Sequence, residues 1–117
     1  MRIPRHPTLL KRQIDSRVRQ FRARGPLLGA SLVRIARTCR SPGCHCQTGT
    51  KHVGNYLTFA VQGKTRTVYV PLDLVEEVRA WIQEHRRLKA LSREISALSI
   101  ARVKGHVKAR KRRKGRS

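Results

Sequence analysis

The stretch that decides the fold is YLTFAVQGKTRTVYVPLD, residues 56–73. Tyr56 to Val61 and Thr65 to Val70 are rich in β-branched and aromatic residues, which predicts two strands. Gly63 and Lys64 between them predict a two-residue hairpin in which Gly63 takes the first position of a type II′ turn. Pro71 has no backbone N–H to donate, so the second strand is expected to end there.

A long helix is expected to follow the hairpin. Asp73 and Glu76, three residues apart, form an acidic version of the capping box that opens helices. An apolar stripe then predicts a helix from Asp73 to Ile100, through Leu74, Val78, Trp81, His85, Leu88, Leu91, Ile95 and Leu98. A small sheet can cover only part of a helix this long, so the apolar stripe of its second half must pack against another element. The N-terminal helix or a second copy of the chain could supply it.

Two further elements are expected before the hairpin. Thr8 is a candidate N-cap for a helix that ends at Arg24, before Gly25 and Pro26. One face of this helix would carry Leu10, Ile14, Val18 and Phe21. Residues 30–38 alternate in the manner of a half-exposed strand, with a short helix as the alternative.

These elements predict an α+β fold with an N-terminal helix, a small antiparallel sheet with a zinc knuckle, a long C-terminal helix and basic tails. The expected organisation is a basic arm over residues 1–7, one zinc-stapled domain over residues 8–100 and a basic tail over residues 101–117. Because the tail is almost wholly basic, we expect it to be disordered alone and to order on phosphate.

The cysteines predict a metal site. Cys39, Cys44 and Cys46 lie within eight residues of one another, and His52 follows six positions later. Closely spaced thiolates and one imidazole suit a closed structural zinc site. His45 is a rival fourth ligand, but its side chain would tend to point away from the neighbouring thiolates. The alternative is that the cysteines are incidental in a loop. No acidic residue between Asp15 and Asp73 could serve as a general base, so the zinc is expected to be structural.

The charge predicts a polyanionic partner. The chain has 117 residues with 28 Lys and Arg against 6 Asp and Glu, a formal net charge of +22. Such self-repulsion favours a partner that neutralises it, and DNA or RNA fits better than a membrane because no apolar run is long enough to span a bilayer. Tyr56, Tyr69 and Trp81 could stack on bases, but in a chain so poor in aromatic residues we expect them in the core.

The candidate phosphate contacts lie in the N-terminal arm and helix, in the sheet region and in the tail. They are Arg2, Arg5, Lys11, Arg12, Arg19, Arg22, Arg34, Arg37, Lys64, Arg66, Lys108, Arg110, Lys111, Arg112, Arg113 and Lys114.

The knuckle Cys39-x4-Cys44-x-Cys46 and the hairpin Gly63-Lys-Thr-Arg-Thr-Val-Tyr-Val-Pro71, followed by a long helix, resemble a widespread family of small uncharacterised prokaryotic proteins. The resemblance covers about residues 28–98. It implies a cysteine-rich knuckle and frequent location near mobile elements, and it transfers no activity.

The resulting hypothesis is a non-enzymatic nucleic-acid-binding protein with a structural zinc ion, making mainly phosphate contacts to DNA or structured RNA. The alternative is a protein-interaction accessory subunit of a mobile-element or ribonucleoprotein complex, with the stripe from Leu88 to Leu98 as its docking face. A protein partner or homodimer through the long helix fits either hypothesis, and no small-molecule substrate is expected. Three cysteines without an apolar leader favour a reducing cytoplasm.

Overall fold

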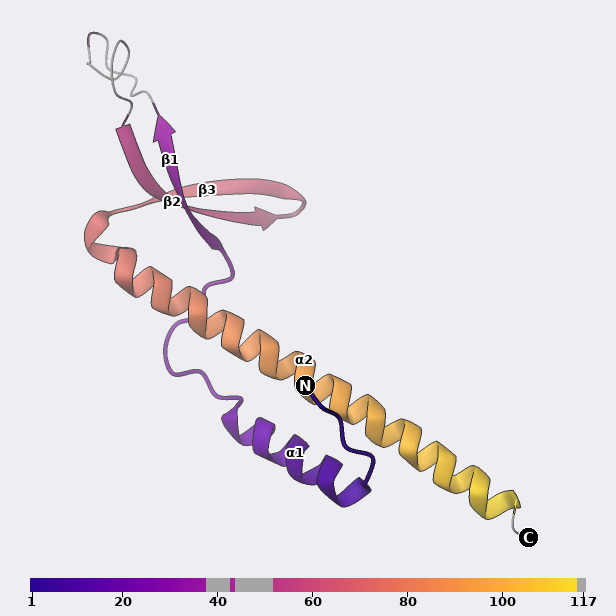
Figure 1. The fold of residues 1–117 in the computed structure, drawn as a ribbon. Helices are drawn as coiled ribbons and strands as arrows, with labels where there is room; N and C mark the ends of the chain where they lie inside the picture. The colour runs from indigo at the N-terminus through magenta and orange to yellow at the C-terminus, as the bar shows by residue number, and fades with distance from the viewer. Residues whose placement is uncertain (38–42, 44–51, 116–117) are drawn as a thin grey trace. The chain divides into compact units, whose positions relative to one another are not determined.

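A computed structural model describes residues 1–37, 43 and 52–115 of the chain. The elements are α1 (Pro7–Gln20), β1 (Ser31–Arg37), β2 (His52–Val61), β3 (Lys64–Val70), the 3-10 turn η2 (Leu72–Leu74) and α2 (Val75–Gly115) (Figure 1). The predicted α+β class, with its helix, antiparallel sheet and long C-terminal helix, is confirmed.

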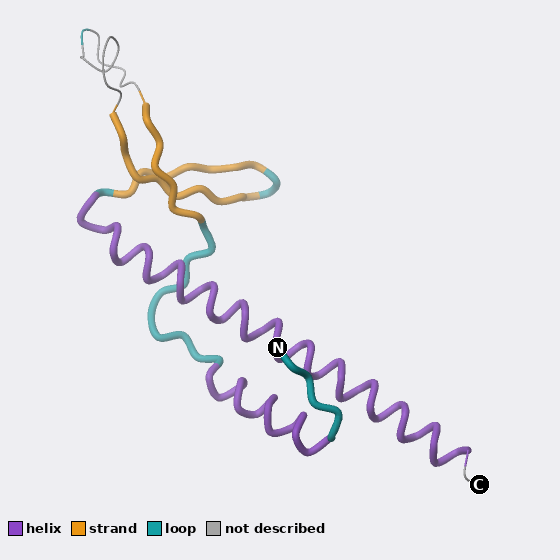
Figure 2. The backbone as a smooth tube through the Cα atoms, in the orientation of Figure 1, coloured by secondary structure: helices purple, strands orange, loops and turns teal. Residues whose placement is uncertain are grey.

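The chain divides into two compact units, and each is described by itself. The sheet unit comprises Gly25–His85, and the helical unit comprises Met1–Arg24 with Arg86–Ser117. The strands belong to the sheet unit, whereas α1 and most of α2 belong to the helical unit. Figure 2 marks these helices and strands along the backbone. The predicted single domain over residues 8–100 stays a prediction.

The sheet has the order β1-β2-β3 with both pairs antiparallel. The strand expected over residues 30–38 is present as β1, so a short helix does not form there. Val61 pairs with Lys64, which leaves Gln62 and Gly63 as the turn residues. Both have positive φ, 51° and 78°, which is typical of a type I′ turn. The predicted type II′ turn at Gly63-Lys64 was therefore wrong by one residue, because Lys64 already belongs to the ladder.

One face of the sheet packs against the first turns of α2. Val70, Val75, Val78 and Ile82 form the buried cluster of this unit. Leu28, Leu32, Leu57 and Trp81 are partly buried against it. Leu32 and Leu57 are directly paired across β1 and β2, so their side chains share the face that covers the helix. This burial is the main stabilising term of the sheet unit.

The helical unit is built on a second set of buried residues, all of them leucines. Leu10 of α1 and Leu98 of α2 are 2% and 0% exposed, and Leu88 and Leu91 are also buried. Nε of Arg17 donates to Oε2 of Glu94 at 2.9 Å, which joins α1 directly to α2. The N-terminal helix therefore packs against the middle of α2, near Arg87 and Glu94.

The boundaries and buried face of α1 differ from those predicted. Thr8 is not the N-cap, because Nδ1 of His6 accepts a hydrogen bond from the Thr8 backbone N–H. With His6 as the N-cap and Pro7 at the first helical position, the helix starts two residues earlier than expected. It ends at Gln20 rather than Arg24, so Phe21 lies beyond it, and both Val18 and Phe21 are exposed.

The long helix also differs at both ends. Residues 72–74 form a 3-10 turn without a side-chain cap, so α2 begins at Val75 rather than at the predicted Asp73. It then continues through Gly115, 15 residues past the expected end at Ile100. Residues 101–115 of the predicted basic tail therefore form the last part of a helix. Arg and Lys have high helix propensity, which supports this extension locally.

Candidate nucleic-acid interface

The C-terminal part of α2 carries the densest group of positive charges. From Arg102 to Gly115 every side chain is exposed, and no acidic residue follows Glu94. His106, Arg110 and Arg113, spaced i, i+4 and i+7, line one shallow surface hollow together with Ala109. Arg112, Arg113 and Lys114 lie in the last turn, where cations favourably oppose the helix dipole. Helical structure thus arrays these cations along a continuous surface.

The two units differ strongly in charge. Of the 28 Lys and Arg residues, 21 belong to the helical unit, whose acids are Asp15 and Glu94 alone. The sheet unit has seven Lys and Arg against four Asp and Glu. Nearly all of the net charge therefore belongs to the helical unit.

All sixteen predicted phosphate contacts have exposed side chains. In the helical unit they comprise Arg2 and Arg5 on the arm, Lys11, Arg12 and Arg19 on α1, Arg22 just beyond it, and the six from Lys108 to Lys114 on α2. Arg34 and Arg37 lie on β1, whereas Lys64 and Arg66 lie on β3 near the hairpin turn.

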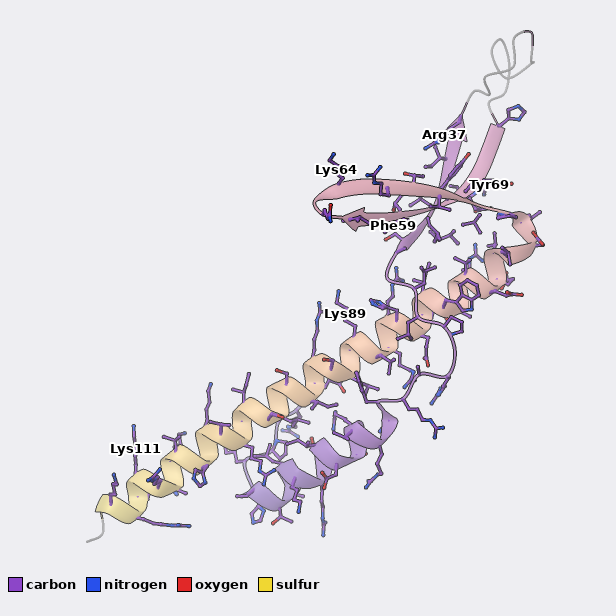
Figure 3. The ribbon with its side chains drawn as sticks, turned by 180° about the vertical axis from the view of Figure 1, so that it is seen from behind. Arg37, Phe59, Lys64, Tyr69, Lys89 and Lys111 are labelled. Carbon is purple, nitrogen blue, oxygen red and sulfur yellow. The ribbon has the colours of Figure 1, made fainter. Side chains whose placement is uncertain are left out.

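Five exposed cations of α2 within the helical unit were missed by the sequence reasoning: Arg86, Lys89, Arg93, Arg102 and Lys104. Lys89 extends away from the helix axis (Figure 3). These residues lie off the apolar stripe of the helix, and that position could have identified them.

Arg17 and Arg87 of the helical unit have structural partners. Arg17 pairs with Glu94 and also donates to the Gln13 backbone carbonyl. Nη1 and Nη2 of Arg87 donate to the backbone carbonyls of Gln20 and Arg22 at 3.1 and 2.7 Å. Gln20 is the last residue of α1 and Arg22 lies two residues beyond it, where helix geometry leaves carbonyl acceptors without intrahelical partners. Arg87 therefore stabilises the end of α1.

A different kind of surface occurs on the sheet. Arg37, Tyr56 and Tyr69 come from β1, β2 and β3, and the Tyr56 ring contacts both Arg37 and Tyr69. Arg37 and Tyr69 lie at one end of the sheet, whereas Lys64 lies at the far end of the β2–β3 hairpin (Figure 3). Trp81 packs against the core as expected, but Tyr69 is 58% exposed. The expectation that the tyrosines belong to the core was therefore wrong: Tyr69 is exposed, and its pairing partner Tyr56 is not part of the buried cluster.

The predicted zinc ligands are described only in part. Cys39, Cys44, Cys46 and the rival ligand His45 lie outside the described residues. His52 is the first residue of β2 and is paired with Arg37, the last residue of β1. The pairing brings the two ends of the cysteine-containing connection together. Within residues 1–37, 43 and 52–115, no group of three His, Cys, Asp or Glu side chains is placed to hold a metal ion.

None of the helices in the described part of the chain has the length and apolar character needed to cross a membrane. Comparison with protein families matches residues 8–80 to the family described as Domain of unknown function (DUF6788). This match covers more than half of the 117 residues. The chain belongs to the DUF6788 family.

Membership of DUF6788 confirms that the chain belongs to an uncharacterised family, and the association with mobile elements stays a prediction. The matched DUF6788 region includes α1 from Thr8 onward and the whole sheet, with Arg37, Tyr56 and Tyr69, but ends before the basic part of α2. Comparisons with curated proteins and with solved structures found no match.

Proposed function

We propose that this protein is a non-enzymatic nucleic-acid-binding protein that holds DNA or structured RNA mainly through its phosphate backbone. The observation that supports this best is the helical unit, in which 21 Lys and Arg residues are opposed by two acids. The cations of α2 from Arg102 to Lys114 are exposed along one continuous helix. Nucleic acid has regularly spaced phosphate charges, and this row of cations on α2 would neutralise them.

Phosphate recognition accounts for the arrangement better than base reading. Lys and Arg dominate the exposed residues of α2 beyond Arg102, where Asn and Gln are absent from the sequence. Those amides, together with Arg, are the side chains that read base edges in the major groove. Contacts to phosphate position a protein on nucleic acid without selecting a sequence. We therefore expect weak sequence preference.

The test is a salt titration of the full chain with fluorescently labelled duplex DNA and, separately, folded RNA. The logarithm of the affinity should fall linearly with the logarithm of salt concentration, with a slope near −0.9 for each phosphate neutralised on DNA. Replacing Lys111, Arg112 and Arg113 together by Ala should lower the affinity and make the slope shallower by up to about 3.

Arg79→Ala is the matched control, because Arg79 is an exposed arginine of α2 that pairs with Glu76 in the sheet unit. It should leave both the affinity and the slope unchanged. Undetectable binding at low salt, or an affinity indifferent to salt, would contradict the proposal.

A structural zinc ion held by Cys39, Cys44, Cys46 and His52 is the second part of the proposal. Its support is the cysteine spacing together with the position of His52 at the paired end of β2. The zinc would close the connection between β1 and β2 and supply stability that a small sheet core lacks. Metal analysis should find one zinc ion per chain, and Cys44→Ser should remove it and lower the melting temperature. Thr38→Ser, beside the first ligand, serves as the control.

The alternative is a protein-interaction accessory subunit of a mobile-element or ribonucleoprotein complex. Its proposed docking stripe includes Leu88, Leu91 and Leu98, which are buried within the helical unit. This burial leaves little of the stripe for a partner unless α1 moves away. Association with a protein partner that is indifferent to salt would favour this alternative.

A further inference from the structure

The face of the sheet opposite α2 carries a cluster of Arg37 with two tyrosines, Tyr56 and Tyr69, and phosphate binding alone gives these tyrosine rings no role. Side chains alternate between the two faces of a strand, so the register assigns each residue to a face. Leu32 and Leu57 face the helix, and the next row, Val33, Tyr56 and Tyr69, therefore faces away from it. Arg37, four residues after Val33 on β1, lies on this same outer face.

The three side chains form a ladder across all three strands. Cζ of Arg37 lies 4.6 Å from the centre of the Tyr56 ring, in cation–π geometry. The Tyr56 and Tyr69 ring centres are 5.5 Å apart with an interplanar angle of 64°. This edge-to-face contact leaves ring surface unpaired. Tyr69, on the edge strand β3, is 58% exposed.

Gly54 makes room for the two rings. A Cβ at this position would lie 3.0 Å from Cε2 of Tyr56 and 3.4 Å from Cε2 of Tyr69. The absence of a side chain therefore lets the rings approach the sheet backbone. Covering Gly54 needs only one edge of each ring, so it does not account for the exposed surface of Tyr69. The exposed face of a tyrosine ring on a sheet can stack on a nucleic-acid base.

The charge around the ladder selects the class of ligand. No acidic residue occurs between Ser31 and Val70, so the three strands carry no negative side chain. A ligand that stacks on tyrosine and is also attracted by arginine combines flat rings with negative charge, as a nucleotide strand does. In a duplex the base faces are covered by their neighbours and only base edges reach the grooves. Stacking on Tyr69 therefore requires unpaired bases.

We propose that the outer face of the sheet binds single-stranded nucleic acid, with a base stacked on Tyr69. Tyr56 extends the platform toward the middle strand, and Arg37 contacts the neighbouring phosphate while it stays over the Tyr56 ring. This inference rests on the proposed nucleic-acid binding and adds to it a single-strand preference and a second site, on the sheet unit. The helical unit neutralises phosphates, whereas the sheet recognises the exposed faces of bases.

The test compares three fluorescently labelled probes on the full chain: an oligothymidine of about 12 nucleotides, an abasic strand of the same length and a duplex. Tyr69→Ala should weaken binding of oligothymidine roughly 5- to 150-fold. It should leave binding of the abasic strand and the duplex unchanged, together with the salt slope, because the phosphate contacts remain. Tyr69→Phe keeps the ring and should retain the affinity for oligothymidine.

Thr67→Ala is the matched control, because Thr67 is exposed on the same face of β3 and carries no ring. Far-UV circular dichroism of each variant checks that the fold is kept. Photocrosslinking of a bromouracil-substituted strand should join it to a peptide that contains Tyr69.

Three results would overturn the inference, and they differ in whether the proposed phosphate binding remains supported. If Tyr69→Ala binds oligothymidine as tightly as the unchanged protein, the platform is wrong but salt-dependent phosphate binding stands. If it weakens all three probes equally, Tyr69 has no role specific to bases. If the unchanged protein binds none of the probes at low salt, the proposed function fails together with the inference.

Discussion

Arginine serves distinct purposes in this chain, and the neighbours of each side chain decide which. Arg17 pairs with Glu94, and Arg87 satisfies carbonyls at the end of α1. Arg37 lies over the Tyr56 ring. The sequence predicted phosphate contacts from charge, and it did not include Arg17 or Arg87 among them, although nothing in the local pattern distinguishes their structural role. Whether an arginine stabilises the fold or is available to a ligand depends on which distant side chains lie beside it in the folded chain.

At the residue scale, the helical unit should depend strongly on Leu98. Its side chain is completely buried, so Leu98→Ala removes apolar contacts and leaves a cavity. We expect the free energy of unfolding to fall by about 2 to 5 kcal/mol. Chemical denaturation followed by far-UV circular dichroism measures this change. Ile100→Ala is the control, because Ile100 is exposed on the same helix, and it should change stability by less than about 0.5 kcal/mol. Equal effects of the two substitutions would contradict the packing of α1 on α2.

At the element scale, α2 combines two different surfaces on one continuous helix. Its first turns bury Val75, Val78 and Ile82 against the sheet, and its end presents the cations beyond Arg102 to solvent. The apolar stripe was predictable because helical periodicity is a local property. The continuation to Gly115 was not predicted, because a block of like charges repels itself and has few apolar residues to bury. In the structure the propensity of Lys, Arg and Ala for helix outweighs that repulsion.

Gly105 tests whether the basic end of α2 is helical. It lies inside the helix, and a Cβ there would meet no atom within 4 Å. Gly105→Ala should stabilise this part of the helix by roughly 1 kcal/mol, whereas Gly105→Pro should destabilise it by about 3 kcal/mol. The circular dichroism signal of helix should rise slightly in the first variant and fall in the second. If both variants match the unchanged protein, residues beyond 105 are not helical in solution.

At the scale of the whole molecule, a net charge of +22 on 117 residues opposes its own folding. Most of this charge belongs to the helical unit, where α1 and α2 are both basic and the ion pair of Arg17 with Glu94 joins them. A bound polyanion would relieve the repulsion, so ligand binding and stability are coupled.

Salt should therefore have opposite effects on stability and on binding. Raising sodium chloride from about 0.05 M to about 0.5 M shortens the screening length and weakens the repulsion within the helical unit. We expect the melting temperature to rise while the affinity for nucleic acid falls. Differential scanning fluorimetry at several salt concentrations measures the first effect. A neutral osmolyte at matched osmolality controls for solvent effects other than screening. A melting temperature that falls or stays constant would show that repulsion does not limit stability.

The sequence by itself determined the classes of the elements, the two hairpin strands, the apolar stripe of α2 and the excess of positive charge. These features depend on composition and short-range periodicity, which act within a few residues. Tertiary structure decided which side chains are covered: Leu10 is buried, whereas Val18 on the same predicted face is exposed. It also decided the ladder of Arg37, Tyr56 and Tyr69, whose members lie 19 and 13 positions apart in the chain. Strand register brings them together, and a shift of one residue in β3 would move Tyr69 to the opposite face.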